Sequence, residues 1–157
     1  SLWFIPPKGG KLHVEGNVRE FSGLAVSPDQ SLLYLTDSSS DWVWCFQIER
    51  DGTLQHEQRY HHLHSDSGGE VGIGGMTVDA AGRLYVATNL GIQVCDQAGR
   101  VNCIIPTPNG IVSSLTFGGA NFDTLFATCG DKIFKRKLKV RGAPAFLPPV
   151  KPAPPRL

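Results

Sequence analysis

The chain has 157 residues, with fifteen lysines and arginines against fourteen aspartates and glutamates, so its formal net charge is +1. This length is enough for one domain with its own core. The balance of charge gives no global field favouring a nucleic acid or a membrane surface, and the apolar runs are too short to span a bilayer.

Eighteen glycines and eleven prolines lie mostly between short apolar runs and near the C-terminal end. No stretch of ten or more residues shows the apolar spacing of a helix. Short apolar runs separated by glycine and proline are typical of a protein built from β-strands. The sequence therefore predicts an all-β fold.

The predicted strands follow one another along the whole chain. Between them lie turns whose residues favour tight reversal, such as Ser27-Pro28-Asp29-Gln30 and Asp51-Gly52. Aspartates in these turns are expected to cap them. The predicted strands cover residues 2–5, 12–14, 23–26, 32–37, 42–48, 54–60, 75–78, 84–88, 91–95, 101–105, 114–117, 124–128 and 132–140.

One sequence pattern is repeated three times, beginning at Gly23, Gly75 and Ser114. It consists of a short apolar strand, a turn and a second apolar strand. Repeats of about 40 to 50 residues with several short strands each are the signature of propeller blades. The chain thus predicts a β-propeller of about three blades, half of a six-bladed one. The predicted parts are outer strands of a preceding blade over 1–21, blades over 22–64 and 74–107, a partial blade over 113–141 and a proline-rich C-terminal tail over 142–157.

Five phrases, in order along the chain, carry a resemblance to a known family. They are GLAVSPDQSLLYLTD at 23–37, DGTL at 51–54, GGMTVDAAGRLYVAT at 74–88, GIQVCDQAGRV at 91–101 and LTFGG at 115–119. Together they resemble the gluconolactonase/regucalcin (senescence marker protein) family over residues 22–141. The resemblance implies a six-bladed propeller, of which this chain matches the C-terminal half, and the activity of a calcium-dependent lactone hydrolase.

The resembled family implies a divalent metal, such as calcium, at one end of the channel, where it polarises a lactone carbonyl and activates water. The implied ligands include a glutamate from the N-terminal half, the asparagine of an Asn-Gly-Leu-Ala phrase and the aspartate of an Asp-Gly-Met phrase. Here Ser22 replaces that asparagine, Gly74 replaces that aspartate, and Ser114 replaces the asparagine of a third phrase. These three positions are expected to line the channel pocket. No metal or other cofactor is expected in this segment, and catalytic residues stay unassigned.

Three functions remain open from the residues. The chain is the C-terminal propeller segment of a gluconolactonase-like hydrolase with a degraded metal site, or a non-catalytic propeller module for binding or assembly. The third is a binding site for a small sugar-lactone-like ligand in the degenerate channel. A fold by itself does not decide between them.

Half a propeller leaves sheet faces and strand edges open. The chain is therefore expected to be a fragment of a longer protein, to pair with a separate N-terminal half-propeller, or to close a ring as a homodimer. In the homodimer, residues 1–21 and 114–128 of two copies would complete shared blades. No nucleic-acid or membrane partner is expected. No secretory leader opens the chain, so a soluble protein is expected, in a compartment that the sequence leaves open.

Two groups of residues offer metal or redox chemistry. His61, His62 and His64 form a cluster. In an extended chain His62 and His64 would share one face and could bind a transition metal, but a polar surface loop is the preferred interpretation. The four cysteines, at 45, 95, 103 and 129, form no Cys-x-x-Cys pair. Reduced structural thiols are expected, with a disulfide as the alternative.

Two segments near the C-terminal end offer partner binding. Residues 132–141 hold six basic side chains, which are interpreted as a solvated outer strand whose lysines discourage edge pairing. The proline-rich tail favours polyproline II and resembles a ligand for aromatic grooves. The tail is expected to drape over the propeller or to hang free.

Overall fold

The computed structural model describes residues 2–14, 16–66 and 72–154, and within these ranges the regular structure consists of antiparallel strands. No helix long and apolar enough to cross a membrane occurs there. The strands are β1 (Leu2–Phe4), β2 (Leu12–Val14), β3 (Phe21–Val26), β4 (Leu32–Asp37), β5 (Trp42–Ile48), β6 (Leu54–His62), β7 (Met76–Val78), β8 (Leu84–Thr88), β9 (Gly91–Cys95), β10 (Val101–Ile105), β11 (Ser114–Gly118), β12 (Thr124–Cys129) and β13 (Lys132–Lys137).

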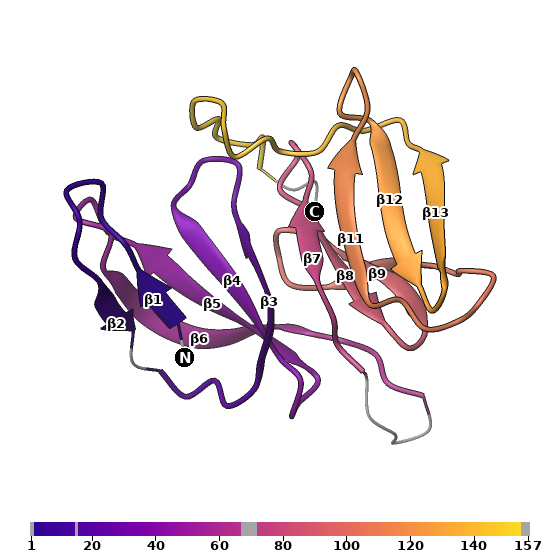
Figure 1. Cartoon of the computed structure of the whole chain (residues 1–157), viewed down its shortest axis with the longest axis horizontal. Helices are drawn as coiled ribbons and strands as arrows, with labels where there is room; N and C mark the ends of the chain where they lie inside the picture. Colours follow the sequence, from indigo (N-terminus) through magenta and orange to yellow (C-terminus); the bar gives the residue numbers. More distant parts are fainter. Residues whose placement is uncertain (1, 15, 67–71, 155–157) are drawn as a thin grey trace.

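Three sheets follow one another in chain order. β3 to β6 form blade 1, β7 to β10 form blade 2, and β11 to β13 form the three-stranded blade 3, while β1 pairs only with β2 among the described strands. Figure 1 shows the blades side by side, and the first strand of each blade forms the inner edge, where β7 contacts both β3 and β11. This is the arrangement of consecutive propeller blades, so the predicted all-β propeller fold is confirmed.

Apolar side chains fill the spaces between blades. The middle strands β4, β5, β8 and β9 are apolar on both faces, because a neighbouring element packs on each side. The cluster between blades 1 and 2 includes Tyr34, Val43, Cys45, Met76, Val78, Leu84 and Val86. The cluster between blades 2 and 3 includes Tyr85, Ile92, Val94, Leu115, Phe117 and Leu125. A third cluster, on the other face of blade 1, contains Val18, Leu33, Leu35, Trp44 and Phe46.

Six of the thirteen strands have the predicted bounds, including β5, β9 and β10, and β1, β3, β7, β11 and β12 differ by one or two residues at one end. The two remaining differences are at the ends of β6 and β13. β6 continues to His62, because that residue still pairs with Trp42 across the ladder. β13 ends at Lys137 rather than at residue 140, and one bond in the same register follows it, from the N–H of Leu138 to the carbonyl of Asp123 at 2.8 Å.

Aspartates cap the turns, as predicted. One carboxylate oxygen of Asp29 accepts hydrogen bonds from the hydroxyls of Ser27 and Ser31, at 2.6 and 2.7 Å. A carboxylate oxygen of Asp51 accepts the backbone N–H of Thr53 at 2.9 Å. These side chains are therefore engaged in local structure and are not free for chemistry.

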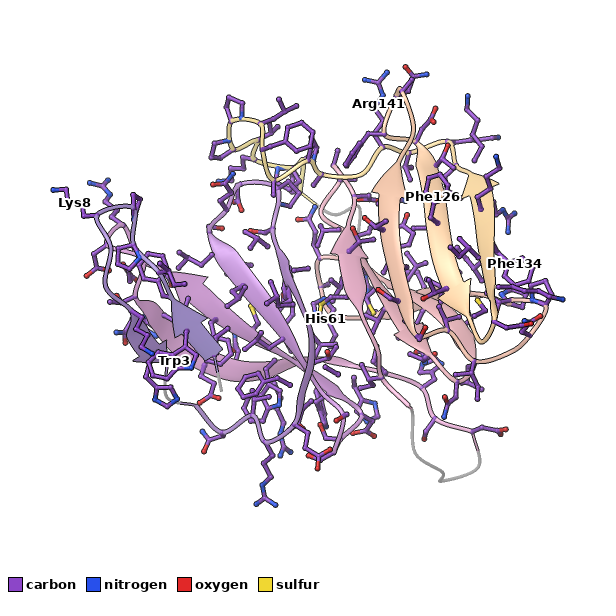
Figure 2. The ribbon with its side chains drawn as sticks, viewed as in Figure 1. Trp3, Lys8, His61, Phe126, Phe134 and Arg141 are labelled. Carbon is purple, nitrogen blue, oxygen red and sulfur yellow. The ribbon has the colours of Figure 1, made fainter. Side chains whose placement is uncertain are left out.

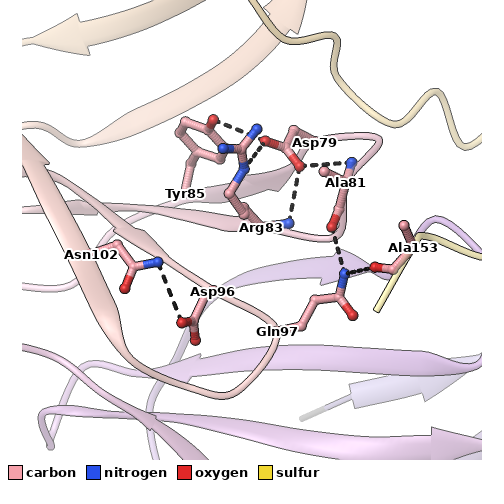
Figure 3. A network of polar contacts seen from close by, with 8 residues as sticks. All are labelled: Asp79, Ala81, Arg83, Tyr85, Asp96, Gln97, Asn102 and Ala153. Carbon is pink, nitrogen blue, oxygen red and sulfur yellow. Dashed lines mark hydrogen bonds and ion pairs between the residues drawn. The ribbon is translucent and has the colours of Figure 1, made fainter. Parts of the chain in front are cut away.

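A turn with the sequence Asp-x-x-Gly-Arg occurs twice in blade 2, at 79–83 and 96–100. Figure 3 shows the polar contacts of the first copy. In each copy one carboxylate oxygen accepts the backbone N–H groups two and four residues further on, at 2.9 and 3.0 Å. The other oxygen accepts the arginine Nε–H, at 2.7 Å in the first copy and 2.9 Å in the second. The turns need glycine, because φ is 78° at Gly82 and 88° at Gly99.

The described part of the C-terminal tail, residues 142–154, drapes over the blades. Backbone hydrogen bonds of 2.9 Å run from the N–H of Ala143 to Val78 in blade 2, and from the N–H of Val150 to Pro28 beside blade 1. Figure 1 shows this segment, in yellow, crossing from blade 3 over the ends of the other two blades. Of the two arrangements expected for the tail, the draped one is therefore present.

The four cysteines are free thiols, so the disulfide alternative is excluded. Cys45, Cys95 and Cys129 are buried between blades, whereas Cys103 is exposed. Burial raises the pKa of Cys45 to about 11 and that of Cys95 to about 12, so both thiols stay protonated at neutral pH. They pack as small apolar side chains, as predicted.

Candidate functional site

The structure places the three predicted channel positions at the beginnings of the three inner strands. Ser22 is the second residue of β3, Gly74 lies two residues before β7, and Ser114 begins β11. The chains approach closely there: a Cβ built on Gly23 lies 2.9 Å from the carbonyl oxygen of Gly74, and one built on Gly75 lies 2.7 Å from Oγ of Ser114. The three positions therefore lie next to one another at one end of the blades.

The hydroxyl of Ser22 is hydrogen-bonded to a second hydroxyl. Its Oγ lies 2.9 Å from Oγ1 of Thr36, which is fully buried. The hydroxyl of Thr36 is also 3.3 Å from the carbonyl oxygen of Gly23 and 3.4 Å from that of Gly74. Thr36 thereby connects the beginnings of β3 and β7.

Gly74 occupies a position that has no room for a side chain. A Cβ built there lies 2.2 Å from the backbone oxygen of Ser113 and 2.9 Å from its carbonyl carbon, distances that real Cβ atoms do not adopt. The strand is held there by hydrogen bonds from the N–H of Gly74 to Ala87, at 2.9 Å, and from the N–H of Gly75 to Ser113, at 3.0 Å. An aspartate at this position requires a shift of the backbone.

A hydroxyl pair similar to that of Ser22 and Thr36 occurs in blade 3, one residue before the predicted position. Oγ of Ser113 lies 2.8 Å from Oγ1 of Thr128, and the hydroxyl of Thr128 is 3.3 Å from the carbonyl oxygen of Ser114. Sequence reasoning missed both threonines as neighbours of the site. The available signal was the threonine near the end of the second strand of each repeat.

The carboxylate of Asp37 lies at the same end, and sequence reasoning assigned it no role. It accepts hydrogen bonds from the N–H and hydroxyl of Ser39, at 3.1 and 2.7 Å, and from the N–H of Glu20, at 3.1 Å. Burial would raise the pKa of this carboxyl, but the hydrogen bonds from Ser39, Glu20 and Arg19 lower it more strongly. Asp37 is therefore an ionised side chain that fixes two loops.

The side chains at the three positions do not fit a divalent metal. Calcium and magnesium take oxygen ligands with at least some carboxylate charge, whereas Ser22 and Ser114 supply hydroxyls and Gly74 supplies no side chain. The described ranges also contain no group of three or more histidine, cysteine, aspartate or glutamate side chains placed to hold a metal. No chemical step through a metal follows from these residues.

The three histidines do not converge, and the predicted surface loop is wrong for His61. That side chain, labelled in Figure 2, is 1% exposed. It lies between the rings of Tyr34 and Tyr60, at 5.4 and 4.9 Å between centroids. His62, the next residue of the strand, points away, and its Nε2 lies 2.8 Å from Oδ2 of Asp41. Alternation along β6 explains the difference, since neighbouring residues face opposite sides of a sheet.

This fold defines a partial β-propeller, and the family follows from comparison with known proteins. The family model described as the SMP-30/Gluconolactonase/LRE-like region matches residues 6–131. The chain belongs to this family.

Two relatives show the extent of the match. A gluconolactonase of Zymomonas mobilis is 25% identical over 150 residues, which are 90% of this chain and 41% of the relative. A protein of Sulfolobus acidocaldarius is 28% identical over 135 residues, covering 80% of this chain and 48% of the relative. The chain thus spans about half the length of the relatives it matches.

Solved structures agree. A gluconolactonase of Xanthomonas campestris superposes with a TM-score of 0.71 at 29% identity, covering 89% of this chain and 43% of the other. A calcium-binding protein of Agrobacterium tumefaciens, regucalcin, superposes with a TM-score of 0.74, covering 93% of this chain and 54% of the other. Its identity is 16%, so this second likeness concerns the fold alone.

Proposed function

We propose that this chain is the C-terminal propeller segment of a gluconolactonase-like protein, related to sugar-lactone hydrolases, whose metal site has degraded. The observation that carries the proposal is the environment of Gly74. The family resemblance puts a metal-binding carboxylate at this position, but the backbone of Ser113 occupies the space that its Cβ would need. At this position the absence of the ligand therefore goes with close packing of two blades.

The remaining groups at this end suit binding better than hydrolysis. Ser22 and Ser113 each share a hydrogen bond with a threonine hydroxyl, at 2.9 and 2.8 Å. Hydroxyls paired in this way are weak nucleophiles, because activation needs an adjacent base. They can donate hydrogen bonds to the hydroxyls of a sugar-lactone-like ligand or accept hydrogen bonds from them.

Titration with calcium, followed by calorimetry, and an assay of gluconolactone hydrolysis test this proposal. The chain is expected to bind no calcium at micromolar concentrations and to hydrolyse the lactone no faster than the buffer does. The gluconolactonase of Xanthomonas campestris serves as the positive control for hydrolysis. Micromolar calcium affinity together with turnover by this chain would show that the site is intact.

A non-catalytic assembly module is the second candidate, and the two end faces of the blade array favour it. Strand register makes Leu24 equivalent to Met76 and Leu115. Each pairs with a residue of the second strand of its blade, and each side chain is on the face toward the preceding blade. Leu24 is 56% exposed, whereas Met76 is 7% and Leu115 is 6% exposed. The face of blade 1 is thus shaped like an interface between blades.

The opposite end of the array shows the same feature. Ile133 of blade 3 is equivalent by register to Val43 and Ile92, which face the following blade. Ile133 is 73% exposed, whereas Val43 is 0% and Ile92 is 3% exposed. We infer that further propeller blades cover both faces, supplied by a second copy of this chain or by a separate half-propeller.

Light scattering after size-exclusion chromatography tests closure by a second copy. The unchanged chain is expected to run as a dimer, and Leu24→Glu and Ile133→Glu are expected to shift it to a monomer, because each buries a charge in an apolar contact. Val150→Glu, at an exposed apolar residue of the tail, is the matched control. A stable, folded monomer of the unchanged chain contradicts homodimer closure.

A further inference from the structure

The C-terminal tail forms the roof of a cavity of about 390 Å³, at the end of the blades opposite to Ser22. The walls of the cavity come from the turn between β3 and β4, from β4 itself, and from the two Asp-x-x-Gly-Arg turns of blade 2. The roof contains Lys151, Pro152 and Pro154. Small-molecule sites measure roughly 300 to 1,000 Å³, so this cavity is large enough for a small ligand.

Two hydrogen bonds hold the tail over the cavity, one on the side of each blade. The N–H of Val150 donates to the carbonyl of Pro28 beside blade 1, at 2.9 Å. Nε2 of Gln97 in blade 2 donates to the carbonyl of Ala153, at 2.9 Å (Figure 3). Lys151 lies between these two attachment points. The roof is therefore fixed to both blades.

The buried side chain of Tyr34 brings an unused hydroxyl to the wall of the cavity. Tyr34 is 5% exposed and belongs to the apolar cluster between blades 1 and 2. Its hydroxyl makes no hydrogen bond among the described residues, whereas the hydroxyl of Tyr60 donates to the carbonyl of Gln97 at 2.7 Å. Burial raises the pKa of Tyr34 and the charge of Asp29 raises it further, so the hydroxyl stays protonated. Because buried polar groups normally have a partner, this hydroxyl indicates a bound molecule.

Two more polar groups of the walls are left with acceptors only. One carboxylate oxygen of Asp29 accepts the bonds that hold its turn, and the other accepts none from the described residues. Burial would raise the pKa of Asp29, but the hydrogen bonds from two serines lower it more strongly, so the carboxylate is ionised. Nε2 of Gln97 donates to two backbone carbonyls, at 2.7 and 2.9 Å, which leaves its side-chain oxygen. Acceptors of this kind suit an ammonium group, which has three N–H donors.

The roof adds a positive charge to the cavity. Among the described residues that line it, only Asp29 and Lys151 are charged, and Lys151 makes no ion pair within the described ranges. Much of the remaining lining is apolar, including Pro28, Leu32 and Pro152. A small molecule that carries an ammonium, a carboxylate and an apolar group matches all three kinds of surface.

We propose that the cavity under the tail binds an α-amino acid with an apolar or aromatic side chain. Its ammonium lies toward Asp29, its carboxylate lies toward Lys151, and its side chain packs on Leu32 and the prolines. In an amino acid the two charged groups are adjacent, so the hydroxyl of Tyr34 can accept from the ammonium and donate to the carboxylate. The inference is independent of the proposed function, because the cavity lies at the other end of the blades.

Calorimetric titration of the full chain with L-phenylalanine tests the proposal, with three analogues that each lack one group. 2-Phenylethylamine lacks the carboxylate, 3-phenylpropanoate lacks the ammonium, and glycine lacks the apolar side chain. L-Phenylalanine is expected to bind, and each analogue is expected to bind at least about tenfold more weakly.

Three variants locate the binding. Tyr34→Phe keeps the ring and removes no hydrogen bond within the described ranges, and it is expected to weaken binding of L-phenylalanine about tenfold. Asp29→Asn is expected to weaken binding of the two ligands with an ammonium group and to spare 3-phenylpropanoate. Lys151→Gln is expected to weaken L-phenylalanine about threefold and to spare 2-phenylethylamine. Asp51→Asn and Lys8→Gln remove the same charges outside the cavity and serve as matched controls.

The inference is overturned if L-phenylalanine does not bind at millimolar concentrations, or if Tyr34→Phe and Asp29→Asn bind it as tightly as the unchanged chain. 2-Phenylethylamine that binds as tightly as L-phenylalanine overturns it in favour of an amine site. 3-Phenylpropanoate that binds as tightly overturns it in favour of an anion site. Calcium-dependent lactone turnover would contradict the proposed function and leave these titrations unaltered, so the two failures are distinguishable.

Discussion

The Asp79→Ala variant is expected to lose roughly 3 to 5 kcal/mol of unfolding free energy, since it leaves the buried Tyr85 hydroxyl and two backbone N–H groups without their acceptor. The carboxylate of Asp79 is 0% exposed and accepts hydrogen bonds from Nε of Arg83 at 2.7 Å and from the hydroxyl of Tyr85 at 3.0 Å (Figure 3). It also accepts the N–H of Ala81 and of Arg83. Urea unfolding followed by tryptophan fluorescence measures the loss.

Asp96→Ala is the matched control, because it removes the same turn motif at a more exposed place. The side chain of Arg100 is 60% exposed. Asn102 donates a hydrogen bond to Asp96 at 3.3 Å, whereas the corresponding donor to Asp79 is the buried hydroxyl of Tyr85. Water can replace the lost partners there, so a loss of about 1 to 2 kcal/mol is expected. Equal losses in the two variants would show that burial of Asp79 adds nothing to its role.

The stability of the chain is expected to fall with pH between about pH 6.5 and pH 4 because of His61. Burial lowers the pKa of His61 to about 4, and the backbone carbonyl of Asp96 opposes this shift only in part. Its Nδ1 has no hydrogen-bond partner among the described residues. Above the usual histidine value the ring is neutral in both states and the stability is complete. As the pH falls, the unfolded chain takes up the proton first. The free energy of unfolding is therefore about 3 kcal/mol lower at pH 4.

Urea unfolding at several pH values, for the unchanged chain and for His61→Gln, measures this contribution. The variant is expected to lose most of the slope of stability against pH in this interval, whatever its stability at neutral pH. His56→Gln, at an exposed histidine, is the matched control. Carboxylates with a lowered pKa, such as Asp29, Asp37 and Asp96, act in all three proteins and cancel in the comparison. An unchanged slope in His61→Gln would contradict the assignment.

Strand positions could be predicted from the sequence because the signals are local. Trp42–Ile48 is a run of apolar residues bounded by serines and an Asp-Gly turn, and the strand has these bounds. The two-sided burial of β8 follows from an apolar run without alternation. The repeat then supplies the order of the sheets, because blades of similar sequence form similar sheets.

Features that depend on contacts between blades could not be predicted in the same way. The sequence shows a glycine at position 74, but the reason for it is the carbonyl of Ser113 in the next blade. The burial of His61 depends on the register of β6, which is shifted by irregular pairing near Val43. Thr36 becomes a neighbour of the site only through its contact with the carbonyl of Gly74 in the next blade.

The draped tail has a consequence for folding. In an array of repeats that contact only their neighbours, unfolding can begin at one end and proceed unit by unit. The hydrogen bond from Val150 to Pro28 is an exception to this pattern, because it joins the segment after the last blade to the first blade. Closing this long loop slows folding, since its entropy must be lost before the contact forms. Once the loop has closed, fraying of either end blade also acts on this bond, which joins the two end blades directly.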